Sequence, residues 1–304
     1  MSLKDLMLPL CLVTGTSPDS VSPFSLAEWL EIKASLIAHS VSAEECIFFS
    51  KNEFSSRLGL STAMADRVFA LLHRDVDFHF ALSHYRAQNI TLLTYEDPLF
   101  PPSLKEKLGL NCPPIFCAKG DLSLLQQQGI GVLSSRLVSE KDKAFAMYTL
   151  PKIMKHHSAI VLGGVSGMMA ELREATVAAG GKAIVFMANS LSQTPEHPTP
   201  RLTCPKGGLV LSLPPYQQAG FEDRAILRNL SVIAFSKATL IIKAEDGKGS
   251  TFLAAKKAQT ENVGALLCHR VGAHMGNQRL IFHGAHPVTS DWDGMRVLSE
   301  ENTQ

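Results

Sequence analysis

The chain has 304 residues, of which 45% are apolar and 19% are charged, and its formal net charge is +1. This composition excludes wholesale disorder, which needs low hydrophobicity and high net charge. No uncharged apolar run approaches the roughly 18 residues that a membrane span requires, so we expect no membrane partner. The first residues, MSLKDLMLPLCLV, lack the cleavage site of a secretory signal. The six cysteines form no CxxC pair, which predicts reduced thiols in a cytoplasmic protein.

Positive charge is not spread evenly along the chain. Residues 1–90 contain 7 Lys and Arg against 10 Asp and Glu, whereas residues 91–304 contain 22 against 18. The asymmetry is compatible with a polyanion site in the second part. A solvated surface explains it equally well.

The first ninety residues predict a small helical bundle. The segment LAEWLEIKASLIA (26–38) places four apolar residues on one face of a helix, namely Leu26, Trp29, Leu30 and Ile37. Ser61 is suited to cap a second helix, in which apolar residues recur from Leu60 to Leu71. The acidic balance of this part argues against DNA binding and favours a scaffold or interaction role.

From residue 90 onward the pattern changes. The segment ITLLT (90–94) predicts a strand. In the following run, EDPLFPPSL, three prolines predict a fixed extended connector rather than a helix. A second break at NCPP (111–114) precedes the apolar run IFCAKG.

Strands and helices then alternate. Apolar strands are expected at 129–135, 159–164, 182–187, 209–213, 238–243 and 264–268, and helices at 141–157, 169–181, 224–236 and 250–260, with a kink or break at Pro151. Strands that are apolar throughout and separated by helices indicate a parallel sheet covered on both faces. We therefore predict an α/β fold with a doubly wound, mainly parallel Rossmann-like sheet in residues 89–304, preceded by a small helical domain in residues 1–88.

Ligands of such sheets bind beyond the carboxyl ends of the strands, where glycines and helix N-termini accommodate phosphate. The candidate nucleic-acid or phosphate-binding residues in these loops are Ser135, Arg136, Ser139, Gly163, Gly164, Ser166, Gly167, Lys182, Arg228, Asn229, Gly249 and Ser250. Alternatives remain for each kind of residue: tight turns for the glycines, a surface ion pair for Arg136, and a solvated strand start for Lys182. GGVSG departs from GxGxxG and EDGKGST departs from GxxxxGK[ST], so we expect no cofactor.

Catalytic patterns are scarce in the sequence. It contains no HExxH or GxSxG motif, and we expect no enzymatic activity. The histidines His269, His274, His283 and His286 cluster in sequence, but their spacing fits no zinc pattern. We expect them in surface loops, without a metal.

Several segments, in order, are similar to one family. They are ITLLTYEDPLFPPSLKEKLGLNCPPIFCAKGDLSLL, GIGVLSSR, VAAGGKAIVF, LVLSLPP, RNLSVIAFSKATLIIKAEDGKGSTFLAAKKA and GNQRLIFHGAHPVTSDWDGM. Over about residues 90–295 the chain resembles the DprA/Smf DNA-processing family. The resemblance implies single-stranded DNA binding, loading of a RecA-type recombinase, a homodimer and a role in natural transformation, without catalysis.

The resemblance also implies site residues. Arg136 matches the Arg of the family's GSR turn, and Lys182 falls at the strand start that follows two glycines. Identities like the family's are kept at Gly163, Gly167, Asn229, Gly249 and Ser250.

The chain departs from the family at charged positions. Where the family has Arg, Asp, His, Arg, Glu and Glu, this sequence has Ser166, Met169, Arg173, Leu230, Leu213 and Lys243. These changes predict a divergent member of the family, with a role in mobile-element or defence biology. Its partner would then be a defence-system protein instead of a RecA-type recombinase. Two other functions remain open. One is a nucleotide-binding or nucleotide-cleaving enzyme of the related phosphoribohydrolase (LOG) fold, although GKGSTFLAA lacks that family's Glu. The other is a scaffold with a degenerate pocket.

Overall fold

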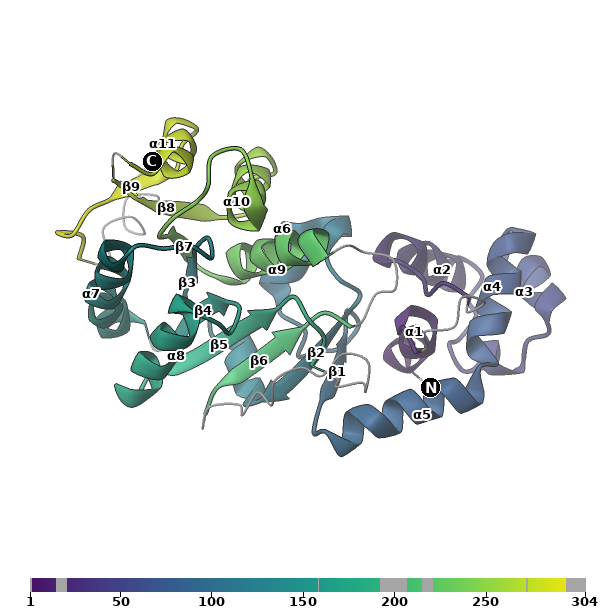
Figure 1. Ribbon diagram of the computed structural model, residues 1–304. Helices are drawn as coiled ribbons and strands as arrows, with labels where there is room; N and C mark the ends of the chain where they lie inside the picture. Colours follow the sequence, from purple (N-terminus) through teal and green to yellow (C-terminus); the bar gives the residue numbers. More distant parts are fainter. Residues whose placement is uncertain are drawn as a thin grey trace.

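The computed structural model describes residues 2–14, 21–157, 159–191, 207–214, 221–271 and 273–293. The chain begins with helices and continues into a single nine-stranded sheet (Figure 1). Within the described residues, no helix has the length and apolar character needed to cross a membrane.

The N-terminal helices are α1 (Leu3–Cys11), α2 (Leu26–Ala38), α3 (Lys51–Leu58), α4 (Thr62–Leu72) and α5 (Asp75–Ala87), with a 3-10 turn at Glu45–Phe48. The predicted helix over 26–38 is confirmed, and the Ser61 side chain caps α4 by accepting from the Met64 N–H. The predicted apolar face of α2 is wrong at Ile37, which is 68% exposed. Ile32 and Leu36 are buried instead, because a 3.6-residue repeat from Trp29 reaches these positions.

The strands are β1 (Thr91–Thr94), β2 (Ile115–Gly120), β3 (Ile130–Leu133), β4 (Ala159–Gly163), β5 (Lys182–Met187), β6 (Leu209–Ser212), β7 (Ala238–Ile241), β8 (Ala265–His269) and β9 (His286–Val288). They lie in the order β1-β2-β6-β5-β4-β3-β7-β8-β9. Pairing is parallel from β6 to β9 and antiparallel at β1–β2 and β2–β6. The predicted mainly parallel sheet is therefore confirmed.

Helices cover both faces of the sheet, as apolar strands require. Figure 1 shows α7 (Glu140–His156) and α8 (Met168–Ala178) on one side. On the other side lie α6 (Pro102–Leu108), α9 (Phe221–Phe235), α10 (Gly249–Thr260) and α11 (Met275–Phe282). Short 3-10 turns at Gly109–Asn111 and Leu122–Gln126 complete the elements.

Two predictions about prolines are corrected by the structure. The run EDPLFPPSL is not extended throughout, because α6 begins at Pro102. Proline suits the first helical position, where an N–H would have no partner within the helix. The helix α7 continues through Pro151 to His156, so the predicted break does not occur.

The N-terminal helices pack against the start of the sheet part. Glu96, just after β1, accepts hydrogen bonds from the Trp29 indole at 2.9 Å and the Lys33 ammonium at 2.8 Å, and Asp97 forms an ion pair with Lys4. One continuous apolar core runs through both parts. The domain division at residues 88 and 89 stays a prediction. Cys204 lies outside the described residues, and the other five cysteines are buried and free.

Candidate functional site

The sheet has a switch point between β3 and β7. From there the chain winds outward to β4 and β5 on one side and to β8 and β9 on the other. Open α/β sheets bind ligands outside the carboxyl ends of the strands at such a point. A pocket of about 680 Å³ lies there, and it is lined by the loops after β3, β4, β5 and β7 together with one side of α9.

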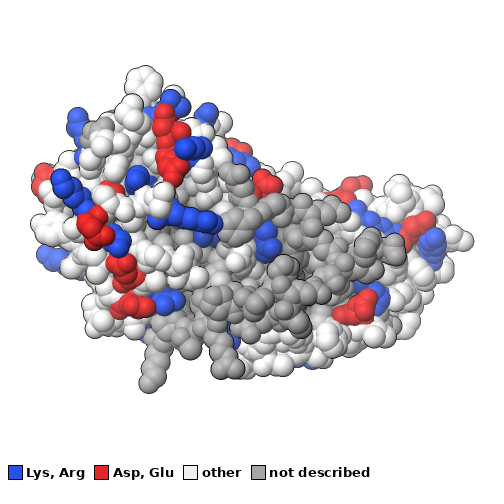
Figure 2. All heavy atoms as spheres, viewed as in Figure 1, with Lys and Arg blue, Asp and Glu red and all other residues white. Residues whose placement is uncertain are grey.

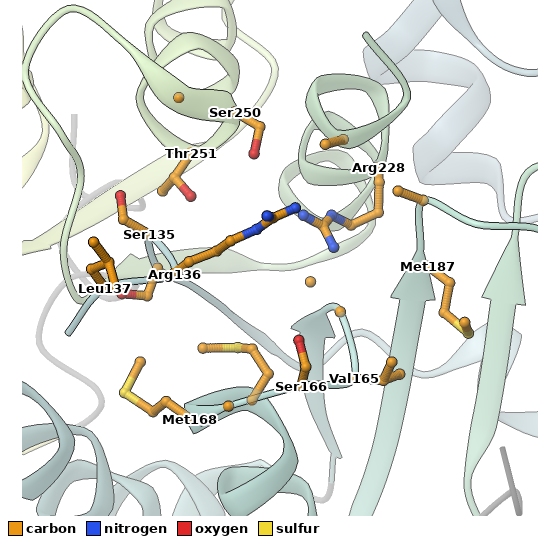
Figure 3. Close-up of a pocket in the computed structure, with 18 of the residues that line it drawn as sticks. Ser135, Arg136, Leu137, Val165, Ser166, Met168, Met187, Arg228, Ser250 and Thr251 are labelled. Carbon is orange, nitrogen blue, oxygen red and sulfur yellow. The ribbon is translucent and has the colours of Figure 1, made fainter. Parts of the chain in front are cut away.

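Two arginines face one another across this pocket. Figure 3 shows Arg136, from the loop after β3, pointing toward Arg228 of α9, above Val165 and Ser166. The Arg228 side chain is half-buried, and its Nε has no hydrogen-bond partner. Burial, together with the nearby Arg136 charge, lowers the pKa of Arg228 to about 10, which leaves the guanidinium charged at neutral pH. A bound anion would supply the hydrogen-bond acceptor that the Arg228 guanidinium lacks.

Two helix N-termini border the same pocket. Gly167 precedes α8 and Gly249 begins α10, and no side chain caps either helix by a hydrogen bond. The first N–H groups of a helix carry partial positive charge and favour phosphate. Glu245 is the one acidic residue among the described residues that line the pocket, and its carboxylate lies 3.7 Å from the Lys248 ammonium. The pocket therefore favours negative charge.

Backbone and side-chain contacts hold the loop that carries Arg136. The Ser135 N–H donates to the Lys243 carbonyl at 2.8 Å, and the Lys243 ammonium donates to the Leu137 carbonyl at 2.8 Å. Lys243 therefore supports this loop through both its carbonyl and its side chain.

The structure brings most of the predicted site residues together. Nine of them line the pocket, namely Ser135, Arg136, Gly163, Gly164, Ser166, Gly167, Arg228, Gly249 and Ser250. Asn229 is buried behind it, and its amide donates to the Ser250 hydroxyl at 3.3 Å. That these residues bind nucleic acid stays a prediction.

Two predicted residues are not part of the pocket. Ser139 is the N-cap of α7, where its hydroxyl bonds Asp142. Lys182 is the first residue of β5, whereas the pocket contacts the other end of that strand from Met187 onward. The prediction that Lys182 lies with the other candidates at the carboxyl ends of the strands is therefore wrong, because the starts of parallel strands lie at the opposite edge of the sheet from their ends.

The floor of the pocket was not predicted. Met168, Met169 and Met187 line it. Leu213 and Leu230, two positions where the resemblance implied a charged residue, are buried in the core. In the sequence, apolar residues near glycines look the same whether they line a pocket or pack in the core.

The histidine prediction is partly wrong. His283 and His286 are exposed, but His269 and His274 are buried and face Asp142. Burial lowers the pKa of His269 to about 4, so its ring is neutral at pH 7. The sequence could not reveal this cluster, because Asp142 lies more than 120 residues away.

Among the described residues, no broad basic face accompanies the pocket in the view of Figure 2. Lys and Arg side chains alternate there with Asp and Glu over the part of the molecule that holds α7, α8, α10 and α11.

A comparison with protein families agrees with this architecture. The model of the family described as DNA recombination-mediator protein A matches residues 91–299, more than two thirds of the chain. The chain belongs to this family. The match begins at β1 and spans every strand of the sheet and all the loops that line the pocket. The predicted family resemblance is confirmed.

Two solved structures share the fold of this family member. DNA processing protein A (DprA) from Streptococcus pneumoniae is 18% identical with a TM-score of 0.69, and the match covers 99% of this chain and 99% of that chain. DNA processing protein A from Helicobacter pylori, described for its single-stranded DNA binding mode, is 21% identical with a TM-score of 0.51. That match covers 65% of this chain and 90% of the other. No curated protein matches the chain.

Proposed function

We propose that the chain binds single-stranded DNA in this pocket, as a recombination mediator that catalyses no reaction. The observation that carries the proposal is the half-buried Arg228, whose Nε has no hydrogen-bond partner, facing Arg136 between two uncapped helix N-termini. A buried polar group without a partner is costly, and a phosphate oxygen would supply the missing acceptor.

The expected contacts are to phosphates rather than to bases. Sequence-tolerant base recognition uses aromatic side chains as stacking platforms. None of the described residues that line the pocket is aromatic. The affinity should therefore depend on salt and vary little with base sequence.

The absence of catalysis is proposed from the side chains at hand. Within the described part of the chain, the pocket lining offers serine and threonine hydroxyls but no His, Cys or Lys. A hydroxyl needs a neighbouring base to become a nucleophile, and Glu245 lies beside Lys248. The nucleotide-cleaving alternative needs a glutamate after the last pocket loop, and the start of α10, GSTFLAA, has none.

We also propose that the bound strand is passed to a partner, either a RecA-type recombinase or, in a defence context, another DNA-binding protein. Membership of a recombination-mediator family supports this step. Addition of the chain to single-stranded DNA covered by a single-strand-binding protein should speed assembly of the recombinase filament. An unchanged rate of filament assembly would exclude the recombinase as the partner and leave the other DNA-binding protein of a defence context.

The direct test of the proposed ligand is a gel-shift titration with single-stranded DNA, duplex DNA and RNA. We expect single-stranded DNA to bind most tightly and Arg136→Ala to weaken it by about tenfold or more, since a hydrogen bond to a charged group contributes roughly 1.5–3 kcal/mol. Lys182→Ala is the matched control, since this lysine lies at the far end of β5, and it should keep the affinity. Equal loss in both variants, or tighter binding of duplex, would contradict the proposal.

A further inference from the structure

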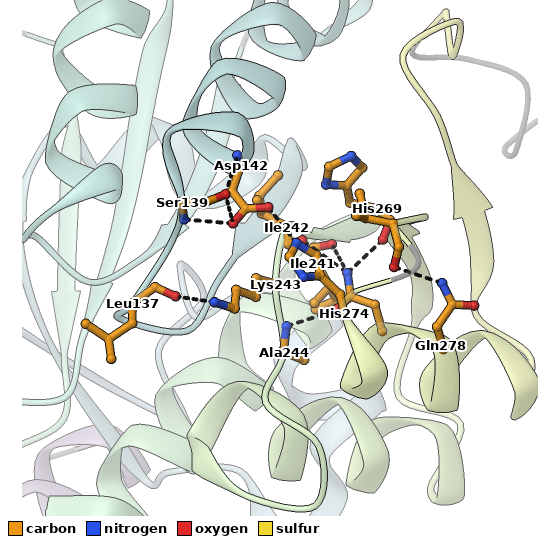
Figure 4. Close-up of polar contacts among 12 residues, drawn as sticks. Leu137, Ser139, Asp142, Ile241, Ile242, Lys243, Ala244, His269, His274 and Gln278 are labelled. Carbon is orange, nitrogen blue, oxygen red and sulfur yellow. Dashed lines mark hydrogen bonds and ion pairs between the residues drawn. The ribbon is translucent and has the colours of Figure 1, made fainter.

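A second cluster of polar side chains lies outside the pocket. Asp142 is in the first turn of α7, His269 ends β8, and His274 precedes α11. Figure 4 shows the three side chains close to one another. One carboxylate oxygen and one ring nitrogen from each histidine lie within 4.8 Å of one another. All three residues are buried, with 2%, 8% and 9% exposure in that order.

Only part of this cluster is explained by contacts within the chain. His274 Nε2 lies 2.5 Å from Asp142 Oδ1, so these two groups satisfy each other. His269 is over nine-tenths buried, yet its Nδ1 has no hydrogen-bond partner. Buried ring nitrogens without a partner are rare, and an absent ion is one of the few reasons for them.

The groups around the cluster hold it in place. The second oxygen of Asp142 accepts from the Ser139 N–H at 2.8 Å and from its hydroxyl at 2.7 Å, which turns Oδ1 toward the histidines. The Asn277 amide donates to the His269 carbonyl at 2.9 Å, and the His269 ring stacks on Phe145 with centroids 3.5 Å apart. Such outer contacts orient the ligands of metal sites.

We propose that Asp142, His269 and His274 form a zinc site. Two imidazole nitrogens and one carboxylate oxygen are a donor set that Zn²⁺ accepts, with water in the fourth position. On binding, the ion takes the place of the proton that His274 Nε2 shares with Asp142 Oδ1, and that proton is released to solvent.

The site would join parts that are far apart in the chain. It connects the start of α7, which follows the Arg136 loop, to the end of β8 and the start of α11. None of its three ligands lines the pocket, so the zinc proposal and the proposed DNA site can fail independently.

The test is calorimetric titration of Zn²⁺ into the full chain after treatment with EDTA. We expect one Zn²⁺ per chain and a higher thermal midpoint in its presence. His269→Leu should weaken Zn²⁺ by at least tenfold, and it should fold, because Nδ1 has no hydrogen-bond partner to lose and the leucine keeps an apolar contact with Phe145. His286→Ala, an exposed histidine near the same sheet edge, should bind as the unchanged chain does.

Co²⁺ in place of Zn²⁺ identifies the donor atoms. The proposal expects visible absorption typical of nitrogen and oxygen ligands, and expects it to disappear in His274→Ala. A thiolate-to-metal band in the near ultraviolet would place the ion on cysteine. The proposal would be overturned by any one of three results: that band, the absence of a stoichiometric Zn²⁺ site, or unchanged Zn²⁺ affinity in His269→Leu.

Discussion

The side chain of Arg228 reaches the pocket past two glycines. A Cβ at Gly163 would lie 3.6 Å from Arg228 Cδ and 2.3 Å from Leu133 Cδ2, and a Cβ at Gly164 would lie 2.9 Å from Arg228 Nη1. Gly164 also has a φ of +110°, which disfavours any side chain. Gly164 therefore leaves space that the arginine occupies, whereas Gly163 leaves space for Leu133.

Gly164→Ala should weaken single-stranded DNA binding, but less than Arg228→Ala does, because the added methyl shifts the flexible end of the guanidinium without removing its charge. Gly180→Ala is the matched control. It also has a positive φ, but a Cβ there would meet nothing within 4 Å, so it should cost some stability and leave the affinity unchanged. Fluorescence anisotropy with a labelled oligonucleotide measures both. Full affinity in Gly164→Ala would show that the position of Arg228 is unimportant.

At the scale of single residues, the sequence predicted which kinds of residue form the site better than it predicted which residues lie close together in the fold. Arg136 was found because it stands in a loop at a strand end, whereas Arg228 lies in the middle of α9, where position relative to a strand gives no such signal. Lys182 was wrongly assigned to the site, because the glycines before it do not indicate at which edge of the sheet the pocket lies. The cluster of Asp142, His269 and His274 depends on contacts between distant segments, which spacing along the chain does not encode.

At the scale of elements, one arginine links the helices of the N-terminal part. Arg67 of α4 donates to the carbonyls of Ser22 and Pro23 at 2.7 Å and pairs with Glu28 of α2 at 2.5 Å. Its guanidinium also lies over the Phe24 ring at 4.1 Å. These contacts fix the chain that enters α2.

Arg67→Ala should lower the free energy of unfolding by about 1–3 kcal/mol, since it leaves several half-buried acceptors without a donor. Lys51→Ala removes another ion pair to α4, with Asp66 at 2.9 Å, but both partners are about half exposed. Such pairs contribute roughly 0–1 kcal/mol, so this variant should change little. Urea unfolding followed by circular dichroism compares the two. Equal losses would contradict the assigned role of Arg67.

Elements with a clear apolar pattern were predicted to their ends, as the apolar run of β5 and the amphipathic helix α2 demonstrate. Those that failed have weak local signals. β9 has only three residues, one of them Pro287, and two are exposed, so no apolar pattern marks it. The antiparallel pairing of β2 depends on which strand lies beside it, and α6 was hidden because proline is favourable at a helix start but unfavourable inside a helix.

For the whole molecule, we predict a homodimer. The prediction stems from the family resemblance, and exposed apolar side chains on α11 support it, with Met275 at 62% and Phe282 at 85% exposure. Phe282→Asp should shift the protein to a monomer in light scattering coupled to size exclusion. Phe48→Asp replaces an 80% exposed phenylalanine in the N-terminal part, and this variant should remain a dimer. Dissociation by Phe48→Asp alone would place the interface elsewhere.

The central claim is that single-stranded DNA binds through phosphate contacts with Arg136 and Arg228. The salt dependence of the affinity tests it most directly, because each phosphate contact adds about 0.7 to the slope of log affinity against log salt for a single strand. We predict that the double variant Arg136→Ala, Arg228→Ala has a slope about 1.4 smaller in magnitude than that of the unchanged chain, with the same thermal midpoint within a few degrees. An unchanged slope and affinity in a folded double variant would contradict the claim.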